Sequence, residues 1–192
     1  MKRIIVFLYA LLLACQAAFA AAPSLPLPGD SLYQSPLSLQ DQQGRQFDLA
    51  SMRGRSVIVS MFYTACSSAC PLTVDTIQEI RRALNVPDRA APTVLLVSID
   101  PQHDDVVNLA AMAKAHRLDP TYWRLTRPTA GDLMAFAATL GVAYRQRTGA
   151  DFSHNAVIAL LDENGRIVAH TSVIGKVDPA FVSAVRERIA GH

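Results

Sequence analysis

Short apolar runs alternate with segments of helical apolar spacing along most of this 192-residue chain. Runs rich in β-branched and aromatic residues predict buried strands, and apolar residues three or four positions apart predict amphipathic helices. We expect strands at 56–63, 93–100, 122–125 and 142–146, and helices at 70–84, 104–118, 129–140 and 178–190. Strands and helices alternate through the first half, which indicates an α/β fold.

Two predicted hairpins flank this alternation. Residues 37–49 form two short strands around a Gln-Gln-Gly turn, and residues 156–171 form two strands around Asn164-Gly165, a dipeptide typical of tight hairpin turns. The late hairpin adds antiparallel strands to a β-α-β core, so we expect a mixed sheet flanked by helices. This order of elements fits a thioredoxin-like core with an extra N-terminal β-hairpin.

The N-terminus predicts export. A short basic start precedes an almost unbroken apolar run, and Ala-Phe-Ala at 18–20 fits the pattern that signal peptidases cleave. Residues 1–20 are therefore interpreted as a signal peptide. Two alternatives remain open: lipid attachment at Cys15, or an uncleaved anchor, since residues 4–22 are just long enough to span a bilayer. All three place the folded part in the periplasm or on the outer face of the cytoplasmic membrane.

Composition limits the classes of partner. Residues 21–36 are rich in proline and predict a linker, which leaves residues 37–192 as one domain. Without the two basic residues of the start, 16 of the 18 Lys and Arg remain against 16 Asp and Glu. The domain is nearly neutral, and the lack of a basic tract with interleaved aromatic residues argues against nucleic-acid binding. A core of this size does not require a disulfide, and we expect a monomer.

A pair of cysteines provides the first candidate chemistry. Cys66 and Cys70 are separated by three residues in "MFYTACSSACPLT", where the strand at 56–63 leads into a helix. Thioredoxin-type redox sites have two residues between their cysteines, and structural zinc sites have four ligands. Unpaired N–H groups and the helix dipole favour a thiolate at a helix N-terminus. Two thiolates on one helical turn can form a disulfide or bind one soft cation.

A histidine would complete a copper site. Cuprous copper accepts two or three soft ligands, so two thiolates and one imidazole suffice. Among the five histidines, His154 in "DFSHNAVIALLDENG" directly precedes a strand of the late hairpin. In a thioredoxin-like fold the loop entering that strand faces the cysteine loop, so His154 is the favoured candidate. His103, in the loop after the strand at 93–100, is less favoured.

These residues resemble the Sco/SenC family, copper-binding factors for respiratory cytochrome oxidase assembly. The resemblance covers residues 39–188 and rests on "FYTACSSACPLT", "VSIDPQHD" and "DFSHNAVIALLDENGRIV", three separate motifs in the family's order. It implies a thioredoxin-like fold and copper, as Cu(I) or Cu(II), bound by Cys66, Cys70 and His154. Asp100 matches an acidic position that the family places near the metal ligands.

The chain departs from the family beside the expected ligands. Ser67 replaces the proline that usually follows the first cysteine, and the usual Asp-His-Ser reads Ser153-His154-Asn155. The "SIDPQHDDV" segment lacks the family's last proline, but no ligand is lost. The client could therefore be a copper-receiving subunit of a respiratory oxidase or another periplasmic copper protein.

A periplasmic thiol–disulfide oxidoreductase is the main alternative, with Cys66 and Cys70 as the redox-active pair. Such enzymes usually carry a cis-proline opposite the cysteines, whereas residues 151–155 contain no proline and include His154. This favours a non-catalytic copper chaperone, although one protein could reduce a client's cysteines and then load them. In an exported domain, we expect the two thiols to form a disulfide when no metal is bound. A peroxiredoxin and a purely structural disulfide are less favoured.

Overall fold

The computed structural model describes residues 26–66, 69–147 and 151–191. The expected signal peptide at 1–20, and with it Cys15, lies outside the described residues. Within the described ranges, every helix is too short or too polar to cross a bilayer.

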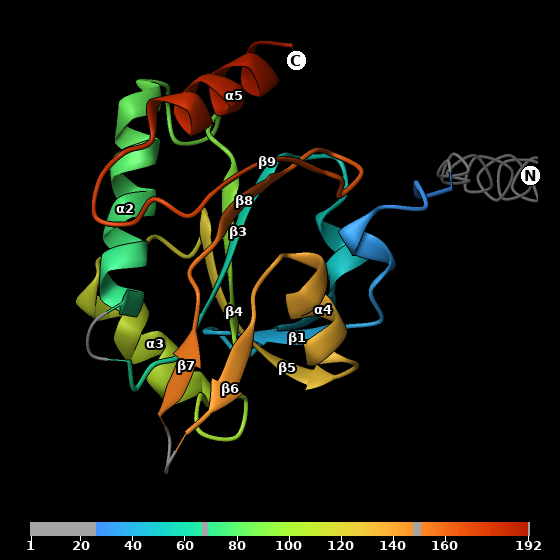
Figure 1. Cartoon of the computed structure of the whole chain (residues 1–192), viewed down its shortest axis with the longest axis vertical. Helices are drawn as coiled ribbons and strands as arrows, with labels where there is room; N and C mark the ends of the chain where they lie inside the picture. The colour runs from blue at the N-terminus through green and yellow to red at the C-terminus, as the bar shows by residue number, and fades with distance from the viewer. Residues whose placement is uncertain (1–25, 67–68, 148–150, 192) are drawn as a thin grey trace, which may run out of the picture.

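A seven-stranded mixed sheet forms the centre of the domain (Figure 1), in the order β2-β1-β5-β4-β3-β8-β9. Strands β3, β4 and β5 are parallel, and the other neighbours pair antiparallel. The strands are β1 Ser38–Asp41, β2 Gln46–Asp48, β3 Val57–Phe62, β4 Thr93–Ser98, β5 Trp123–Ala130, β8 Ile158–Leu161 and β9 Ile167–Thr171. The predicted α/β fold with a mixed sheet and an N-terminal hairpin is confirmed.

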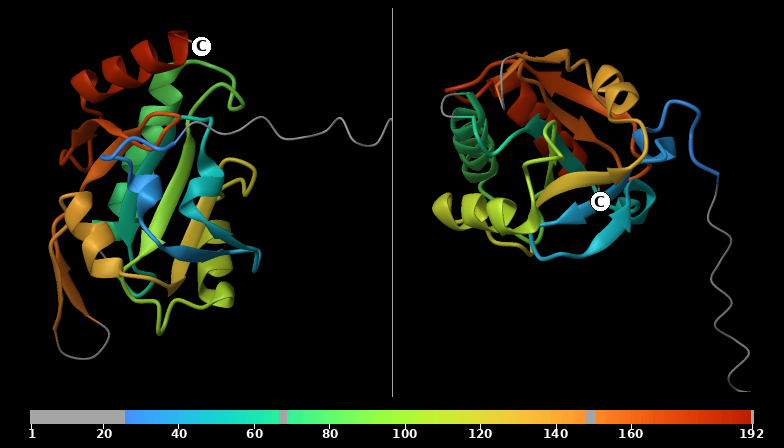
Figure 2. Two further views of the ribbon diagram at one scale, coloured as in Figure 1. Left: turned by 90° about the vertical axis from the view of Figure 1, so that its right-hand side faces the viewer. Right: turned by 90° about the horizontal axis from the view of Figure 1, so that it is seen from below.

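Helices cover both faces of this sheet (Figures 1 and 2). Helices α2 and α3 lie on one face, α4 lies on the other, and α5 packs against α2 and β9. The helices are α2 Ala69–Leu84, α3 Val106–Ala115, α4 Leu133–Thr139 and α5 Pro179–Ala190, with short 3-10 helices η2 Leu32–Gln34 and η3 Leu49–Met52. Three of the α-helices begin directly after an aspartate whose side chain accepts a backbone N–H of the first turn, namely Asp105, Asp132 and Asp178.

Helix α4 begins later than its sequence pattern predicted. The pattern placed a helix at 129–140, whereas the structure has Leu133–Thr139. Residues through Ala130 remain in strand β5, because β5 pairs with β1 as far as the Ser38–Ala130 partners. Asp132 then caps the helix. Sheet pairing with a distant segment has overridden local helical spacing here.

The spacing of Leu72, Thr76, Ile80 and Leu84 predicts that these residues share one buried side of α2, and this prediction is partly wrong. Thr76, Ile80 and Leu84 are buried, but Leu72 is 46% exposed. Residues four apart advance by 400°, so each step along this row rotates the side chain by about 40° around the helix. Across three steps the row turns by roughly 120°, and its first member leaves the buried face.

The folded domain begins before residue 37, where the sequence pattern placed the end of the linker. Leu32 and Tyr33, within the predicted linker at 21–36, are buried in the core. The Leu32 N–H donates to the Gly165 carbonyl at 2.8 Å, and the Tyr33 hydroxyl donates to the Met52 carbonyl at 3.4 Å. The second half of the predicted linker is therefore part of the domain, since Leu32 bonds to the β8–β9 turn and the Tyr33 side chain contacts both that turn and η3.

Strand β3 fixes the position of the segment that follows it. All six of its residues are buried, between parallel β4 and antiparallel β8. A strand paired on both edges and covered on both faces has little freedom to shift. The chain therefore leaves the C-terminal end of β3 at a defined point, where the cysteine segment begins.

A second, two-stranded sheet extends from the same end of the domain. It consists of β6 Tyr144–Gln146 and β7 Phe152–His154, paired antiparallel with Tyr144 opposite His154. The strand expected at 142–146 is confirmed as β6, whereas the pattern did not predict β7. This ribbon is not hydrogen-bonded into the main sheet, so other contacts must hold it in place.

The contact of the β8–β9 turn with the N-terminal segment predicts a large effect of substituting Gly165. Gly165 has φ +81°, and an added Cβ would lie 2.5 Å from a Tyr33 ring carbon. Gly44 has φ +79° in the β1–β2 turn, with nothing within 4 Å of an added Cβ. Gly44→Ala should cost about 1–2 kcal/mol of unfolding free energy from backbone strain, and Gly165→Ala a further 1–3 kcal/mol or so from the steric clash. Denaturant unfolding measures both, and equal losses would refute packing of the N-terminal segment on this turn.

Candidate metal centre

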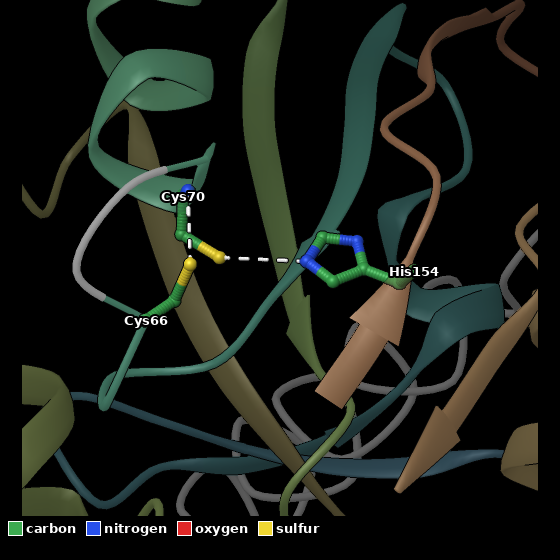
Figure 3. Close-up of side chains that lie close together, drawn as sticks. All are labelled: Cys66, Cys70 and His154. Atoms are coloured by element: carbon green, nitrogen blue, oxygen red, sulfur yellow. Dashed lines mark hydrogen bonds between the residues drawn. The ribbon is translucent and has the colours of Figure 1, made fainter. Parts of the chain in front are cut away.

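The two cysteines lie at the start of α2, as the sequence predicted. Cys66 is in the connection between β3 and α2, and Cys70 is in the first turn of the helix. Cys70 is buried and Cys66 is half-buried. The backbone N–H of Cys70 donates to the Cys66 Sγ at 3.3 Å (Figure 3). An N–H group directed at this sulfur favours negative charge on it, which is the form that binds metals.

His154 faces the cysteines from the second sheet. It is the last residue of β7, and its Nε2 lies 3.9 Å from the Cys70 Sγ (Figure 3). The ligand atoms of Cys66, Cys70 and His154 all lie within 4.8 Å of one another. Among the described residues this is the one cluster of three or more such side chains. The structure thus brings together the three residues that the sequence singled out.

The geometry of the three donors suits a single soft metal ion. Protein sulfur and nitrogen ligands bind such ions at about 2.0–2.3 Å, which puts the donors of a trigonal site roughly 3.5–4.0 Å apart. The Cys70–His154 separation of 3.9 Å already matches this spacing. The remaining separations, at most 4.8 Å, need only a small inward movement. Two sulfurs and one imidazole are a ligand set that copper accepts.

Burial makes the two cysteines chemically different. Burial raises the pKa of the Cys70 thiol well above its usual range, and the nearby Cys66 sulfur and Asp104 carboxylate raise it further. Cys70 therefore keeps its proton at neutral pH when no metal is bound. A metal ion that binds here must displace that proton, so binding weakens as the pH falls.

Asp104 holds the connection that carries Cys66. Its buried carboxylate accepts the Thr64 backbone N–H at 3.1 Å, and the hydroxyls of Thr64 and Ser98 also donate to it. Burial raises the pKa of Asp104, although these hydrogen bonds favour its ionised form. The carboxylate thereby ties the end of β4 to the residues before Cys66. Sequence reasoning missed this role, although the residue lies in the quoted "SIDPQHDD" segment.

Asp100 and His103 form a separate pair. The Nδ1 of His103 lies 2.8 Å from both carboxylate oxygens of Asp100, and the Asp100 backbone N–H donates to the Ser98 hydroxyl. His103 is thus directed to Asp100 and is not in the cysteine cluster. The acidic group that contacts the cysteine connection is Asp104, four residues after the position expected from the family resemblance.

Tyr63 connects the cysteine strand to the histidine strand. Its buried ring contacts the His154 ring edge-on, with centroids 5.9 Å apart, and its hydroxyl lies 3.0 Å from the Asp151 carboxylate. Burial raises the pKa of Tyr63 to about 12, so the hydroxyl stays protonated and donates this bond. The same ring packs on Phe152 at 5.3 Å. The aromatic residue three positions before Cys66 could have signalled this contact in the sequence.

Comparison with known proteins places these residues in a family. A sequence model described as SCO1/SenC matches residues 27–189, most of the chain. A Stutzerimonas stutzeri protein named "Putative copper-binding protein" is 25% identical over 146 residues, which are 74% of this chain and 70% of the relative. The mitochondrial SCO2 homolog of Mus musculus is 32% identical over 82 residues, 42% of this chain and 31% of that protein.

Solved structures share the fold. Copper-bound ScoI of Bradyrhizobium japonicum superposes with a TM-score of 0.60 and 25% identity, covering 80% of this chain and 97% of that chain. The thioredoxin-like arrangement expected from the order of elements thus agrees with structures of this family.

Replacement of the Asp104 carboxylate tests its role in holding the cysteine connection. Asp104→Asn leaves one acceptor oxygen for donors on Thr64 and Ser98, so we expect a loss of about 1–3 kcal/mol in unfolding free energy. Thiol labelling of Cys66 should also become faster because its connection loosens. Asp75→Asn is the control, since Asp75 is 58% exposed and lies 3.5 Å from His116. Equal effects of the two substitutions on stability and on labelling would contradict the assigned role.

Proposed function

The chain belongs to the SCO1/SenC family, and we propose that it is an exported copper-binding chaperone that delivers copper to a respiratory cytochrome oxidase or prepares the oxidase's copper site. The observation that carries this proposal is the cluster of Cys66, Cys70 and His154, with donor atoms within 4.8 Å. The Stutzerimonas stutzeri relative named "Putative copper-binding protein" and copper-bound ScoI of Bradyrhizobium japonicum support the choice of metal.

The ligand set favours copper over zinc. Two thiolates satisfy the soft, low-coordinate Cu(I) ion, and the imidazole adds the nitrogen donor that Cu(II) prefers. Structural zinc sites are closed by four protein ligands, whereas the cluster in the described part of the chain provides three. Copper also stands above zinc in the affinity order of divalent ions for a given site.

The site suits transfer because its ligands differ in accessibility. Cys70 is 1% exposed, while Cys66 and His154 are half-buried. A client's thiol or imidazole can therefore approach the metal from the side of Cys66 and His154. We expect these two ligands to be replaced first, with Cys70 the last to leave the metal.

The proposed place of action rests on the N-terminal sequence pattern, and the proposed client rests on the family. The pattern at 1–20 supports function in the periplasm or at the outer face of the cytoplasmic membrane. Membership of the SCO1/SenC family, which the sequence motifs link to respiratory cytochrome oxidase assembly, supports a client among the respiratory oxidases. Another periplasmic copper protein is the alternative client.

Copper titration of the reduced protein tests the function. We expect one equivalent of Cu(II) to give a sulfur-to-copper charge-transfer band, which Cys66→Ser and Cys70→Ser should each abolish or greatly weaken. His154→Ala should reduce Cu(II) affinity by more than the roughly 10–100-fold that loss of an outer hydrogen-bond partner costs. Cu(I) affinity should fall less, since both thiolates remain.

His103→Ala is the matched control for the histidine variant. It removes an imidazole that contacts Asp100, outside the cysteine cluster, so both copper affinities should stay close to those of the parent. Cu(II) affinity that survives His154→Ala would refute the assigned ligand set. Equal competition by zinc for the site would refute the preference for copper.

Thiol–disulfide exchange is a second candidate activity that one observation favours. The Cys70 N–H directed at the Cys66 Sγ favours a thiolate on the more accessible cysteine, which is the sulfur that would attack a client disulfide. The Cys66 thiolate would displace one client thiolate and form a mixed disulfide. Cys70 would then give its proton to the released client thiolate, attack the Cys66 sulfur, displace the second client thiolate and close a Cys66–Cys70 disulfide. The two electrons pass from this pair to the client's two sulfurs.

Copper binding and the Cys66–Cys70 disulfide should exclude each other, because both use the same two sulfurs. After air oxidation, we expect the metal-free protein to lose two titratable thiols. Protein loaded with Cu(I) should retain both once the metal is removed under anaerobic conditions. Thiol counts by a chromogenic disulfide reagent measure the difference, and identical counts in both samples would contradict this mutual exclusion.

A further inference from the structure

A hydrogen bond determines which nitrogen of His154 faces the sulfurs. The ring Nδ1 lies 3.0 Å from the backbone carbonyl oxygen of Asn155. A carbonyl oxygen can only accept, so in the neutral ring Nδ1 carries the proton. The other nitrogen, Nε2, then presents its lone pair, and this is the atom 3.9 Å from the Cys70 Sγ.

The Asn155 side chain fixes the peptide that makes this bond. Its Oδ1 accepts the Ala143 backbone N–H at 2.7 Å, and its Nδ2 donates to the Gly141 carbonyl at 2.9 Å. The Asn155 backbone N–H also donates to the Ala143 carbonyl at 3.3 Å. These three bonds attach the chain just after His154 to the connection between α4 and β6. They restrict the backbone at Asn155, and this restriction favours the carbonyl orientation that meets the His154 ring.

We propose that Asn155 is a positioning residue for His154, which holds the imidazole in the Nδ1–H tautomer with Nε2 free to bind the metal. The part of this proposal that concerns copper rests on the proposed function, whereas the tautomer is a property of the metal-free protein. Histidines that bind metals commonly donate their second ring N–H to a carbonyl or carboxylate, which sets the tautomer and the ring orientation.

The chemistry of the side chain explains why asparagine suits this position. An amide places an acceptor and a donor on separate atoms, and both are used here, toward Ala143 and Gly141. The serine usual in the family at this position has one hydroxyl and cannot reach both groups. In the alternative tautomer, Nε2 carries the proton and donates toward the Cys70 sulfur, so the ring has no lone pair directed at the metal.

The experiment reads the tautomer directly in the metal-free, reduced protein. Long-range proton–nitrogen correlation spectra of the histidine rings distinguish a proton on Nδ1 from one on Nε2. The spectra are recorded near pH 8.5, about two units above the usual histidine pKa, so that the rings are neutral. The parent should show a single Nδ1–H form for His154, and Asn155→Ala should show a mixture of both. Asn155→Ser should be intermediate, because one hydroxyl can restore one of the two bonds.

Copper binding provides the second measurement. Asn155→Ala should weaken Cu(II) binding roughly tenfold, at the low end of the range for loss of such supporting groups, and Cu(I) binding less. Gln34→Ala is the matched control, since the exposed Gln34 amide also donates to a backbone carbonyl, that of Pro28, in the N-terminal segment. This control should change neither the tautomer nor the copper affinities.

The outcomes separate this inference from the proposed function. An unchanged Nδ1–H form of His154 in both Asn155→Ala and Asn155→Ser overturns the positioning role, whether or not the parent binds copper. If Asn155→Ala shifts the tautomer and the parent protein binds no copper, the positioning role is supported and the copper function is refuted. Since Asn155 is exposed, we expect both variants to fold, and the serine variant suffices for the test if the alanine variant does not.

Discussion

The link between Tyr63 and the strand that carries His154 is the contact on which the geometry of the site depends. The cysteines follow a strand of the main sheet, whereas the histidine ends a ribbon that is not hydrogen-bonded into that sheet. The Tyr63 ring packs on Phe152 and His154, and its hydroxyl bonds to Asp151. One side chain at the end of β3 thus sets how far the imidazole stands from the sulfurs.

The rest of the architecture supplies a rigid base for that contact. Strand β3 is buried throughout and paired on both edges, so the position of Tyr63 just beyond its end is well defined. Asp104, in the β4–α3 connection, holds the cysteine connection, and Asn155, in the β7–β8 connection, ties the histidine to the α4–β6 connection. With Tyr63, three residues from three different connections support the site. A metal site assembled in this way has few degrees of freedom left to lose on binding, which favours affinity.

Burial at this site has opposing consequences for metal binding. Removal of Cys70 from water raises its pKa, so the metal must displace a proton from it. The same burial excludes competing ligands from that side and leaves Cys66 and His154 as the accessible donors. The proposed delivery of copper would use this asymmetry, with one buried ligand retaining the ion while the others exchange.

The sequence by itself determined most of the fold and the three candidate ligands. Apolar runs and turn residues are local signals, so β3, α2 and the two hairpins could be predicted from them. The same signals placed the cysteine pair where a strand leads into a helix. The start of α4 could not be predicted, because sheet pairing up to Ala130 decides it. The exposure of Leu72 was missed although it follows from the slow rotation of an i, i+4 row, which is a local property of the helix. His154 was found by its place before β8 and by resemblance, yet β7 itself was missed.

Only the tertiary structure decided which side chains surround the ligands. Tyr63 contacts residues about 90 positions away, and Asn155 bonds to residues 12 and 14 positions before it. Such contacts leave no periodic pattern in the sequence, because each depends on where two separately folded segments meet. The sequence likewise does not show which of Asp100 and Asp104 contacts the cysteine connection. Both lie in "SIDPQHDDV", and the turn between them directs the Asp100 carboxylate to His103 and the Asp104 carboxylate to the cysteine connection.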